Sequence, residues 1–283
     1  MPRQLNYGIE DDFALSVGLS CGGEVSVLLE KHWAFSDVPE TRNIWDMLQV
    51  CIEKNDPVVL ISSLAFEKEN IDENKTPLLF LPEKDETFGN LLINRELATK
   101  MAMASYKRRE NSIVEIGGKN FFIQIFPRQD QLLIIGAGHI SIPLVRFAKE
   151  LDFLTAVIDP RSVFSNLERF DIPPDKLINK WPDQVLNDWP LNEDTYALLL
   201  THDPKIDDPA LQILLKHNLS YIGALGSKRT HAKRCIRLES AGIKKDSIKK
   251  IKGPAGTDIG AQTAAEIALS MIAEVIAAKR GRI

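Results

Sequence analysis

The 283-residue chain is poor in cysteine: Cys21, Cys51 and Cys235 lie far apart and form no CxxC pair. A sparse and odd number of cysteines excludes a disulfide framework and a structural zinc site, and it favours a reducing compartment. The chain also lacks an excess of positive charge, since 35 Lys and Arg residues face 39 Asp and Glu residues for a net charge of -4. Phosphate binding along a nucleic acid normally needs a basic domain, so we expect no nucleic-acid partner.

Long apolar runs are missing as well. The most apolar late stretch, residues 264–278, contains Glu266 and Glu274 and is shorter than the roughly 20 apolar residues that cross a bilayer. The first residues show no basic segment followed by an apolar one, which a signal peptide would have. With 44% hydrophobic and 26% charged residues, the composition is that of a globular protein. We therefore expect a soluble, cytoplasmic protein of about two domains with no membrane partner.

The carboxyl-terminal half alternates between short apolar runs and helical patterns. The apolar runs are residues 132–135, 155–158, 196–200 and 221–223, and the most regular helical patterns cover residues 144–151 and 267–276. After the third run we expect a helix capped by Asp208, with Pro209 in its first turn. Strands separated by helices require crossovers, which favours an α/β domain with a parallel sheet covered on both faces.

The first 130 residues have a different pattern. Helices are predicted for residues 40–53 and 95–109, strands for 58–66 and 78–81, and a hairpin for 112–126 with its turn at Gly117-Gly118. The polar residues 127–130 form the joint between the two halves. We therefore predict a smaller α+β domain over residues 1–130 and an α/β domain over residues 131–283.

A glycine-containing segment follows the first strand of the carboxyl-terminal half. Gly136, Gly138 and His139 lie between a strand and a helix, where glycines let the backbone approach a phosphate at the positive end of the helix. Ser141 occupies the place of a third glycine, and Asp159 ends the next strand, where an acid can bind a ribose hydroxyl. The pattern predicts a phosphate or nucleotide site, and the alternative is a tight turn with no ligand.

Polar residues also follow the third strand. Thr201, His202 and Asp203 should emerge at the carboxyl edge of the sheet, where ligands bind in open parallel sheets. With Asp207 and Asp208 nearby, a hard metal ion or a proton-transfer role is one interpretation. The other is that the carboxylates only cap turns and a helix.

The fourth strand ends in a second glycine segment with Gly226, Ser227 and Lys228, and it opens a basic run. Residues 228–252 contain ten Lys or Arg against two acids, Glu239 and Asp246. Such a run binds an anion or an acidic partner, or it is a solvated helix face. Ser227 and Lys228 are the better candidates for ligand binding.

The amino-terminal half has one unusual feature, Cys21-Gly22-Gly23. Glycines beside a cysteine expose its sulfur, and free N–H groups stabilise a thiolate that can bind a soft metal. A lone cysteine is otherwise most often part of the core.

These segments, in this order, resemble the XdhC/CoxI family, the maturation factors of xanthine and carbon monoxide dehydrogenases. The resemblance is carried by Cys21-Gly22-Gly23, Gly136-Ala137-Gly138-His139, Asp159-Pro160-Arg161 with Glu168-Arg169-Phe170, Thr201-His202-Asp203, residues 221–229, and residues 258–261 with 266–270. It implies a Rossmann-like carboxyl-terminal domain in a chaperone that binds molybdenum cofactor and supports its sulfuration and insertion into a molybdenum hydroxylase.

The resemblance also implies the residues and partners of the site. The cofactor-binding candidates are Cys21, Gly22, Gly23, Gly136, Gly138, His139, Asp159, Arg161, Thr201, His202, Asp203, Gly226, Ser227 and Lys228, with Cys21 as the metal ligand. A molybdenum hydroxylase is the expected client, a cysteine desulfurase the expected second partner, and a homodimer the expected assembly. Relatives carry a further segment before the equivalent of Tyr7, so the first domain is expected to be shortened here.

Two other functions stay open from the sequence. Gly136, Gly138 and Asp159 also suit an NAD(P)-dependent oxidoreductase. The basic run would suit an interaction protein that binds no cofactor. No complete arrangement of nucleophile, base and orienting group is evident, which favours a carrier over a hydrolase.

Overall fold

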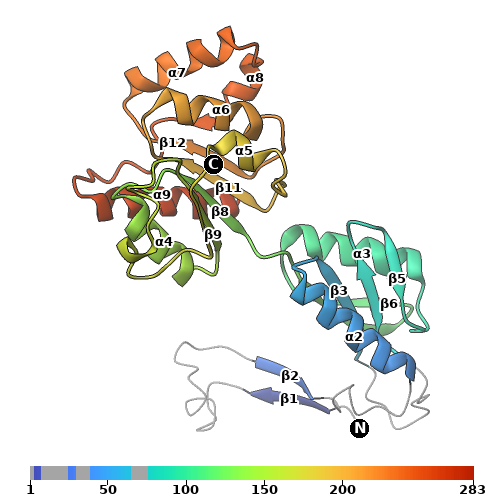
Figure 1. Cartoon of the computed structure of the whole chain (residues 1–283). Coiled ribbons are helices and arrows are strands. Elements are labelled where there is room, and N and C mark those ends of the chain that lie inside the picture. The colour runs from blue at the N-terminus through green and yellow to red at the C-terminus, as the bar shows by residue number, and fades with distance from the viewer. Residues whose placement is uncertain (1–2, 8–24, 30–38, 65–75) are drawn as a thin grey trace. The chain divides into compact units, whose positions relative to one another are not determined.

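The computed structural model describes residues 3–7, 25–29, 39–64 and 76–283. The chain forms two compact units, Met1–Arg128 and Gln129–Ile283 (Figure 1). Among the described residues, none of the helices is both long enough and apolar enough to cross a membrane.

The amino-terminal unit is built on a five-stranded antiparallel sheet in the order β5-β4-β3-β7-β6. Its elements are α2 (Pro39–Glu53), β3 (Val58–Ser63), β4 (Leu78–Leu81), β5 (Glu86–Phe88), α3 (Arg95–Arg108), β6 (Ser112–Ile116) and β7 (Lys119–Phe126), and a separate pair of strands is formed by β1 (Arg3–Tyr7) and β2 (Val25–Leu29). Alternate residues of β3 face opposite sides, so that Val59 packs in the cluster with α3 and Leu60 in the cluster with α2. The predicted hairpin is confirmed, with positive φ angles at Gly117 and Gly118 in its turn.

The carboxyl-terminal unit contains a six-stranded parallel sheet in the order β10-β9-β8-β11-β12-β13. The strands are β8 (Gln131–Ile135), β9 (Leu154–Ile158), β10 (Lys176–Ile178), β11 (Thr195–Leu199), β12 (Tyr221–Ala224) and β13 (Ile251–Lys252). The chain begins in the middle of the sheet, runs to one edge, and returns to β11 on the other side of β8. This is the Rossmann strand order, in which ligands bind where the order reverses, between β8 and β11. The predicted α/β fold is confirmed.

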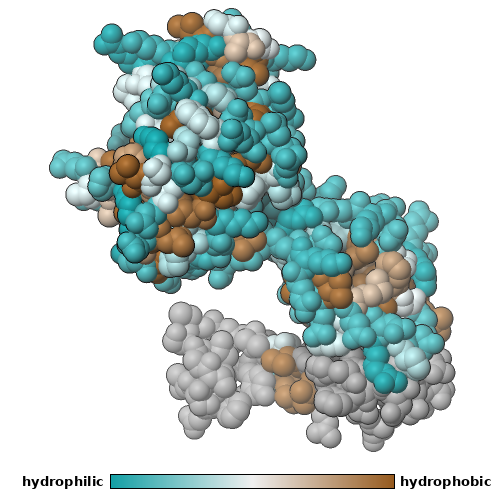
Figure 2. Space-filling view, in the orientation of Figure 1, coloured by the Kyte–Doolittle hydropathy of each residue, from teal (hydrophilic) through white to brown (hydrophobic). Residues whose placement is uncertain are grey.

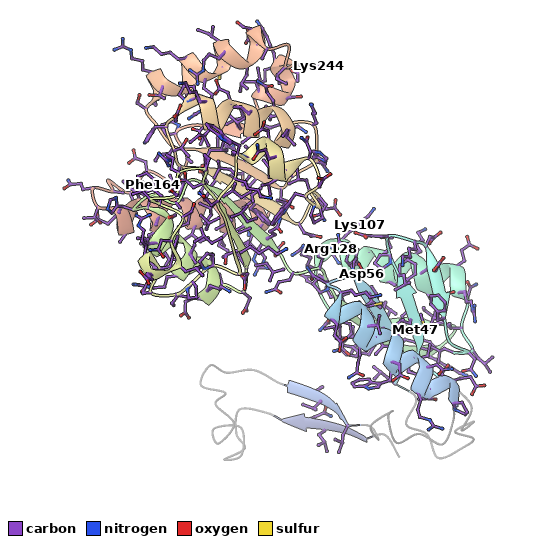
Figure 3. The ribbon with its side chains drawn as sticks, in the orientation of Figure 1. Met47, Asp56, Lys107, Arg128, Phe164 and Lys244 are labelled. Atoms are coloured by element: carbon purple, nitrogen blue, oxygen red, sulfur yellow. The ribbon has the colours of Figure 1, made fainter. Side chains whose placement is uncertain are left out.

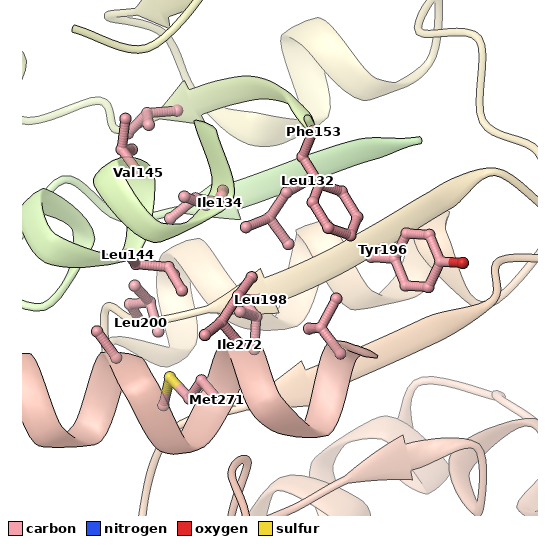
Figure 4. Packing of buried hydrophobic residues seen from close by; sticks show 14 of the residues in the cluster. Leu132, Ile134, Leu144, Val145, Phe153, Tyr196, Leu198, Leu200, Met271 and Ile272 are labelled. Atoms are coloured by element: carbon pink, nitrogen blue, oxygen red, sulfur yellow. The ribbon is translucent and has the colours of Figure 1, made fainter. Parts of the chain in front are cut away.

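Helices cover both faces of this sheet (Figure 1). One face carries α4 (Ser141–Glu150) and α9 (Ala264–Lys279), and the other carries α5 (Pro182–Leu186), α6 (Pro204–Leu214), α7 (Lys228–Ser240) and α8 (Lys245–Ile248). Figure 4 shows Leu132, Ile134 and Leu198 of the strands packed against Leu144 of α4 and Ile272 of α9. Burial on both faces explains why β8 and β11 are continuous apolar runs in the sequence.

The start of α6 corrects the sequence prediction. The helix begins at Pro204, and its N-cap is Asp203, whose carboxylate accepts the N–H of Lys205 at 2.9 Å. Pro209 lies inside the helix, and Asp208 forms an ion pair with Arg237 of α7 instead of a cap. Two Asp-Pro pairs compete in this stretch, and the first one begins the helix since Asp203 lies closer to the strand end.

Candidate functional site

The ends of four neighbouring strands meet at the carboxyl edge of the parallel sheet. Gly136, after β8, has φ +110°, and a Cβ there would lie 2.7 Å from Cγ2 of Thr201, after β11. A Cβ at Gly226, after β12, would lie 3.8 Å from Nδ1 of His202. Asp159, after β9, accepts the N–H of Ala137 at 2.8 Å. The structure therefore brings these predicted residues to one place.

The loop after β8 presents unpaired backbone N–H groups. Ser141 is buried, and its hydroxyl donates to the carbonyl of Gly138 at 2.7 Å, so a serine fits the position of the third glycine. Within the described part of the chain, the N–H groups of Gly138, His139 and Ile140 have no hydrogen-bond acceptor. A Cβ at Gly138 would meet nothing within 4 Å. Since α4 begins without a side-chain cap, the loop and the helix dipole together suit an anion.

Asp159 holds this loop in place. Its side chain is completely buried. Oδ2 accepts from Ala137 N and Arg161 Nη2, and Oδ1 accepts from Arg161 N and Nε, at 2.7 to 2.9 Å. Burial alone would raise the pKa of Asp159, but the hydrogen bonds from Arg161 and Ala137 hold it below its ordinary value. The carboxylate is therefore a charged structural anchor in which all four acceptor positions are filled.

Two arginines flank an aromatic ring in the segment after β9. The guanidinium carbons of Arg161 and Arg169 lie 4.4 Å and 5.1 Å from the ring centroid of Phe164, a residue that is labelled in Figure 3. Arg169 also donates to the carbonyls of Ala137 and Phe164 at 2.5 and 2.9 Å. Stacking and these hydrogen bonds orient both cations beside the glycine loop. Sequence reasoning missed Phe164, although its position between two arginines of the family motif was a usable signal.

Two hydrogen bonds of the Thr201 hydroxyl fix the turn after β11. Thr201 donates to Oδ1 of Asp207 at 2.5 Å, and its hydroxyl oxygen accepts the N–H of Asp203 at 3.1 Å. His202, between them, is exposed and has φ +59°, a conformation uncommon outside glycine. Burial raises the pKa of Asp207, opposed by the hydrogen bond from Thr201 and the charge of Arg234. Thr201 and Asp203 are half-buried and Asp203 caps α6, whereas His202 is exposed to solvent.

The turn after β12 begins α7. Ser227 is exposed and caps the helix by accepting the N–H of Thr230 at 3.1 Å, and Lys228 is exposed in the first turn. The rest of the basic run extends through α7 and α8 to β13, and Nζ of Lys249 lies 2.9 Å from Oδ1 of Asp246. Figure 2 shows mainly hydrophilic residues over these two helices. Most basic residues of the run are exposed, as expected for a solvated face, whereas Arg234 is buried.

The remaining predicted site residues, Cys21, Gly22 and Gly23, lie outside the described residues. Of the other cysteines, Cys51 is buried, and burial raises the pKa of its thiol. The Sγ atom of Cys235 lies 3.6 Å from Nε2 of His231 on the same helix. In the described ranges, no three or more His, Cys, Asp or Glu side chains gather as a metal site.

Two hydrogen bonds to Glu274 fix the segment that leads into α9. Glu274 accepts from the hydroxyl of Tyr221 at 2.5 Å and from the N–H of Gly256 at 2.6 Å. Burial and the neighbouring Glu274 carboxylate raise the pKa of Tyr221. At Gly256, φ is +105° and a Cβ would lie 2.4 Å from Ser270 Oγ, so this position requires glycine. No sequence pattern marks Glu274, which resembles any polar residue of an amphipathic helix.

Several known proteins are similar to this chain. Residues 132–275 match the XdhC Rossmann domain family. A Bacillus subtilis protein described as a probable subunit of xanthine dehydrogenase is 27% identical over 277 residues, which are 96% of this chain and 74% of that protein. The molybdenum cofactor insertion chaperone PaoD of Escherichia coli is 38% identical over 85 residues, 30% of this chain and 27% of PaoD.

A solved structure is similar over the whole chain. The crystal structure of a xanthine dehydrogenase from Bacillus halodurans superimposes with a TM-score of 0.70 and 26% sequence identity, covering 100% of this chain and 76% of that one. The strand order, the glycine loop with its Asp159 anchor and the match over residues 132–275 lead to one conclusion: the chain belongs to the XdhC family.

Proposed function

We propose that this protein is a maturation chaperone that binds molybdenum cofactor at the carboxyl edge of the Rossmann sheet and delivers it to a molybdenum hydroxylase such as xanthine dehydrogenase. The names of two relatives support the proposal: one is a probable component of xanthine dehydrogenase, and the other is a molybdenum cofactor insertion chaperone. The observation that carries it is the loop after β8. Among the described residues, its N–H groups at Gly138, His139 and Ile140 have no acceptor, and two oriented arginines lie beside it.

The cofactor is the cargo, and its phosphate matches this loop. Backbone N–H groups at a helix start bind phosphate without a counter-charge of their own, and the open space at Gly138 allows close approach. Arg169 adds positive charge at the same edge, whereas the charge of Arg161, whose side chain is 37% exposed, is balanced by its ion pair with Asp159. Neutral amides and surface cations hold an anion in a site open to solvent, which suits a carrier that must later release it.

The oxidoreductase alternative gains no support from the acidic residue that suggested it. A ribose hydroxyl needs a free acceptor at the end of β9, but Asp159 is buried and its acceptor positions are filled by Ala137 and Arg161. We therefore expect NADH and NADPH to bind weakly or not at all. Micromolar NADH binding with hydride transfer would favour the enzyme.

The amino-terminal motif completes the proposal. We propose Cys21 as a thiolate ligand of the metal, because it stands in the motif Cys21-Gly22-Gly23 and a thiolate is a soft ligand. A cysteine desulfurase as sulfur donor and a homodimer belong to the same proposal.

The test is to purify the protein from a molybdenum-replete host and to measure molybdenum and oxidised pterin fluorescence after gel filtration. We expect both to elute with the protein and to pass to an apo molybdenum hydroxylase, restoring its activity. Pterin at background level under conditions that load other molybdenum proteins of the same host would contradict the proposal. As a control, the Asp246→Asn variant should retain molybdenum and pterin like the wild type, because Asp246 is exposed on α8 and pairs only with Lys249 of the same segment in the described structure.

A further inference from the structure

A buried arginine lies beneath two of the loops at the carboxyl edge. Arg234, on α7, is 1% exposed and is the largest of the fully buried side chains. Its Nη2 donates to the carbonyl of Leu225 at 3.0 Å and lies 3.6 Å from Oδ2 of Asp207, which is 2% exposed. The guanidinium therefore joins α7 to the end of β12 and to the first turn of α6.

The carboxylate of Asp207 extends this connection to the end of β11. Its Oδ1 accepts from Thr201, and the Thr201 hydroxyl accepts the N–H of Asp203. These two hydrogen bonds enclose His202, whose φ of +59° is kept only where the surroundings impose it. The network therefore fixes the turn that presents the His202 ring.

The carbonyl of Leu225 extends the connection to the other turn. Leu225 directly precedes Gly226, and a Cβ at Gly226 would lie 3.8 Å from Nδ1 of His202. One guanidinium thus contacts the backbone beneath one turn and, through Asp207, the backbone beneath the other. This side-chain link adds to the backbone hydrogen bond that the N–H of Leu225 donates to the carbonyl of Leu199.

Stability alone does not account for an arginine at this position. The Nε and Nη1 atoms of Arg234 are buried without a hydrogen-bond partner, which disfavours the folded state. Arg234 precedes the buried Leu238 by one helical turn, in the stripe of α7 that faces the core. Apolar residues commonly replace a buried ion pair with no loss of stability. What an apolar residue cannot supply is the link between the two turns.

We propose that Arg234 is a positioning residue of the anion site: through Leu225 and Asp207 it holds the Gly226 and His202 turns at the separation at which they border a phosphate ester bound at the loop after β8. This inference rests on the proposed function, because the phosphate group of the cargo is the ligand whose site these turns border.

The variants are Arg234→Met, Arg234→Lys and the double variant Arg234→Met/Asp207→Leu. The double variant removes both buried charges together, so it should fold even if Arg234→Met alone leaves the Asp207 charge unpaired and does not fold. The matched control is Arg237→Met, since Arg237 lies on the same helix and pairs with Asp208, the neighbour of Asp207. The probe is the phosphate ester of 6-hydroxymethylpterin, titrated by calorimetry into the full chain. Amide exchange over residues 201–203 and 225–227 is measured without ligand, with β8 amides reporting global stability.

We expect Arg234→Met and the double variant to weaken binding at least tenfold and to speed amide exchange at both turns at least tenfold, with β8 unchanged. Arg234→Lys should restore part of the affinity because it keeps a donor for Leu225, and Arg237→Met should bind like the wild type. A folded double variant with wild-type affinity overturns the positioning role and leaves the proposed function standing. If the wild type does not bind the probe, the proposed function fails, and unchanged exchange at the two turns in Arg234→Met then overturns the positioning role as well.

Discussion

Two glycines of one loop should respond to substitution in opposite ways. Gly138→Val adds a branched side chain where a Cβ meets nothing within 4 Å and where φ is not positive. A change at such an open position typically alters stability by less than about 0.5 kcal/mol. The side chain would nevertheless cover the free N–H groups of Gly138 and His139, so we expect retention of the pterin cargo to fall to background.

Gly136→Ala is the opposite case. Its Cβ would lie 2.7 Å from Cγ2 and 3.2 Å from the backbone N of Thr201, at a φ of +110°. A strained backbone costs about 1–3 kcal/mol, and forcing extra atoms into a packed region costs a similar amount. We therefore expect a loss of about 2–6 kcal/mol, or roughly 4–24 °C in Tm for a unit of this size.

The assay combines urea unfolding, followed by tryptophan fluorescence, with molybdenum and pterin content after gel filtration. Gly138→Val should unfold at the wild-type urea concentration and elute without pterin. Gly136→Ala should unfold early yet keep some cargo in its folded fraction. If Gly138→Val is as unstable as Gly136→Ala, or if it keeps its full cargo, then the loop does not bind the phosphate through its free N–H groups.

Three further predictions concern the anchor, the last helix and the amino-terminal cysteine. The pKa of Asp159 is lowered in the folded state, so its charge stabilises the protein above the ordinary aspartate pKa, and this stabilisation is lost as the pH falls through the lower, folded value. The difference in unfolding free energy between wild type and Asp159→Asn should therefore shrink below about pH 4. If urea unfolding gives a difference that does not change between about pH 3 and pH 7, Asp159 is not a charged anchor. Thr263 forms a capping box with Glu266 at the start of α9, so Thr263→Ala should cost about 1 kcal/mol by thermal unfolding, with Thr263→Ser as the control that restores it. Cys21→Ser should lower the molybdenum and pterin retained without changing Tm, and retention equal to the wild type would remove Cys21 as a ligand.

The fold was predictable where burial leaves a pattern. The apolar runs at 132–135 and 196–200 become β8 and β11 because helices cover both faces of the sheet. The strands β5, β10 and β13 were not predicted, since edge strands of two or three residues carry too little alternation to be recognised. The start of α6 was misplaced by five residues because local capping chemistry alone does not choose between Asp203 and Asp208.

The site was predictable only in part. Strand ends and glycines located its edge, since Gly136 and Gly226 follow buried runs. Which polar groups are free there depends on partners distant in sequence: Ala137 for Asp159, and Leu225 with Asp207 for Arg234. Arg234 itself was interpreted as part of a basic run, although one helical turn separates it from the buried Leu238. A charged residue in the apolar stripe of a helix was the available signal.

The hydrogen bonds that Asp159 accepts restrict the kind of ligand that can bind at the carboxyl edge of the parallel sheet. In a dinucleotide site, the loop after the first strand binds the phosphates and the acid after the second strand binds the ribose. Here the acid is turned inward to Arg161 and Ala137, while Gly138 and His139 keep their N–H groups free. The phosphate half of the site is thus open and the ribose half is filled. Because Arg161 is itself stacked on Phe164, freeing the acid would cost both an ion pair and a ring contact. A ligand with a phosphate and no ribose beside it, such as the pterin of the molybdenum cofactor, fits this division better than a dinucleotide.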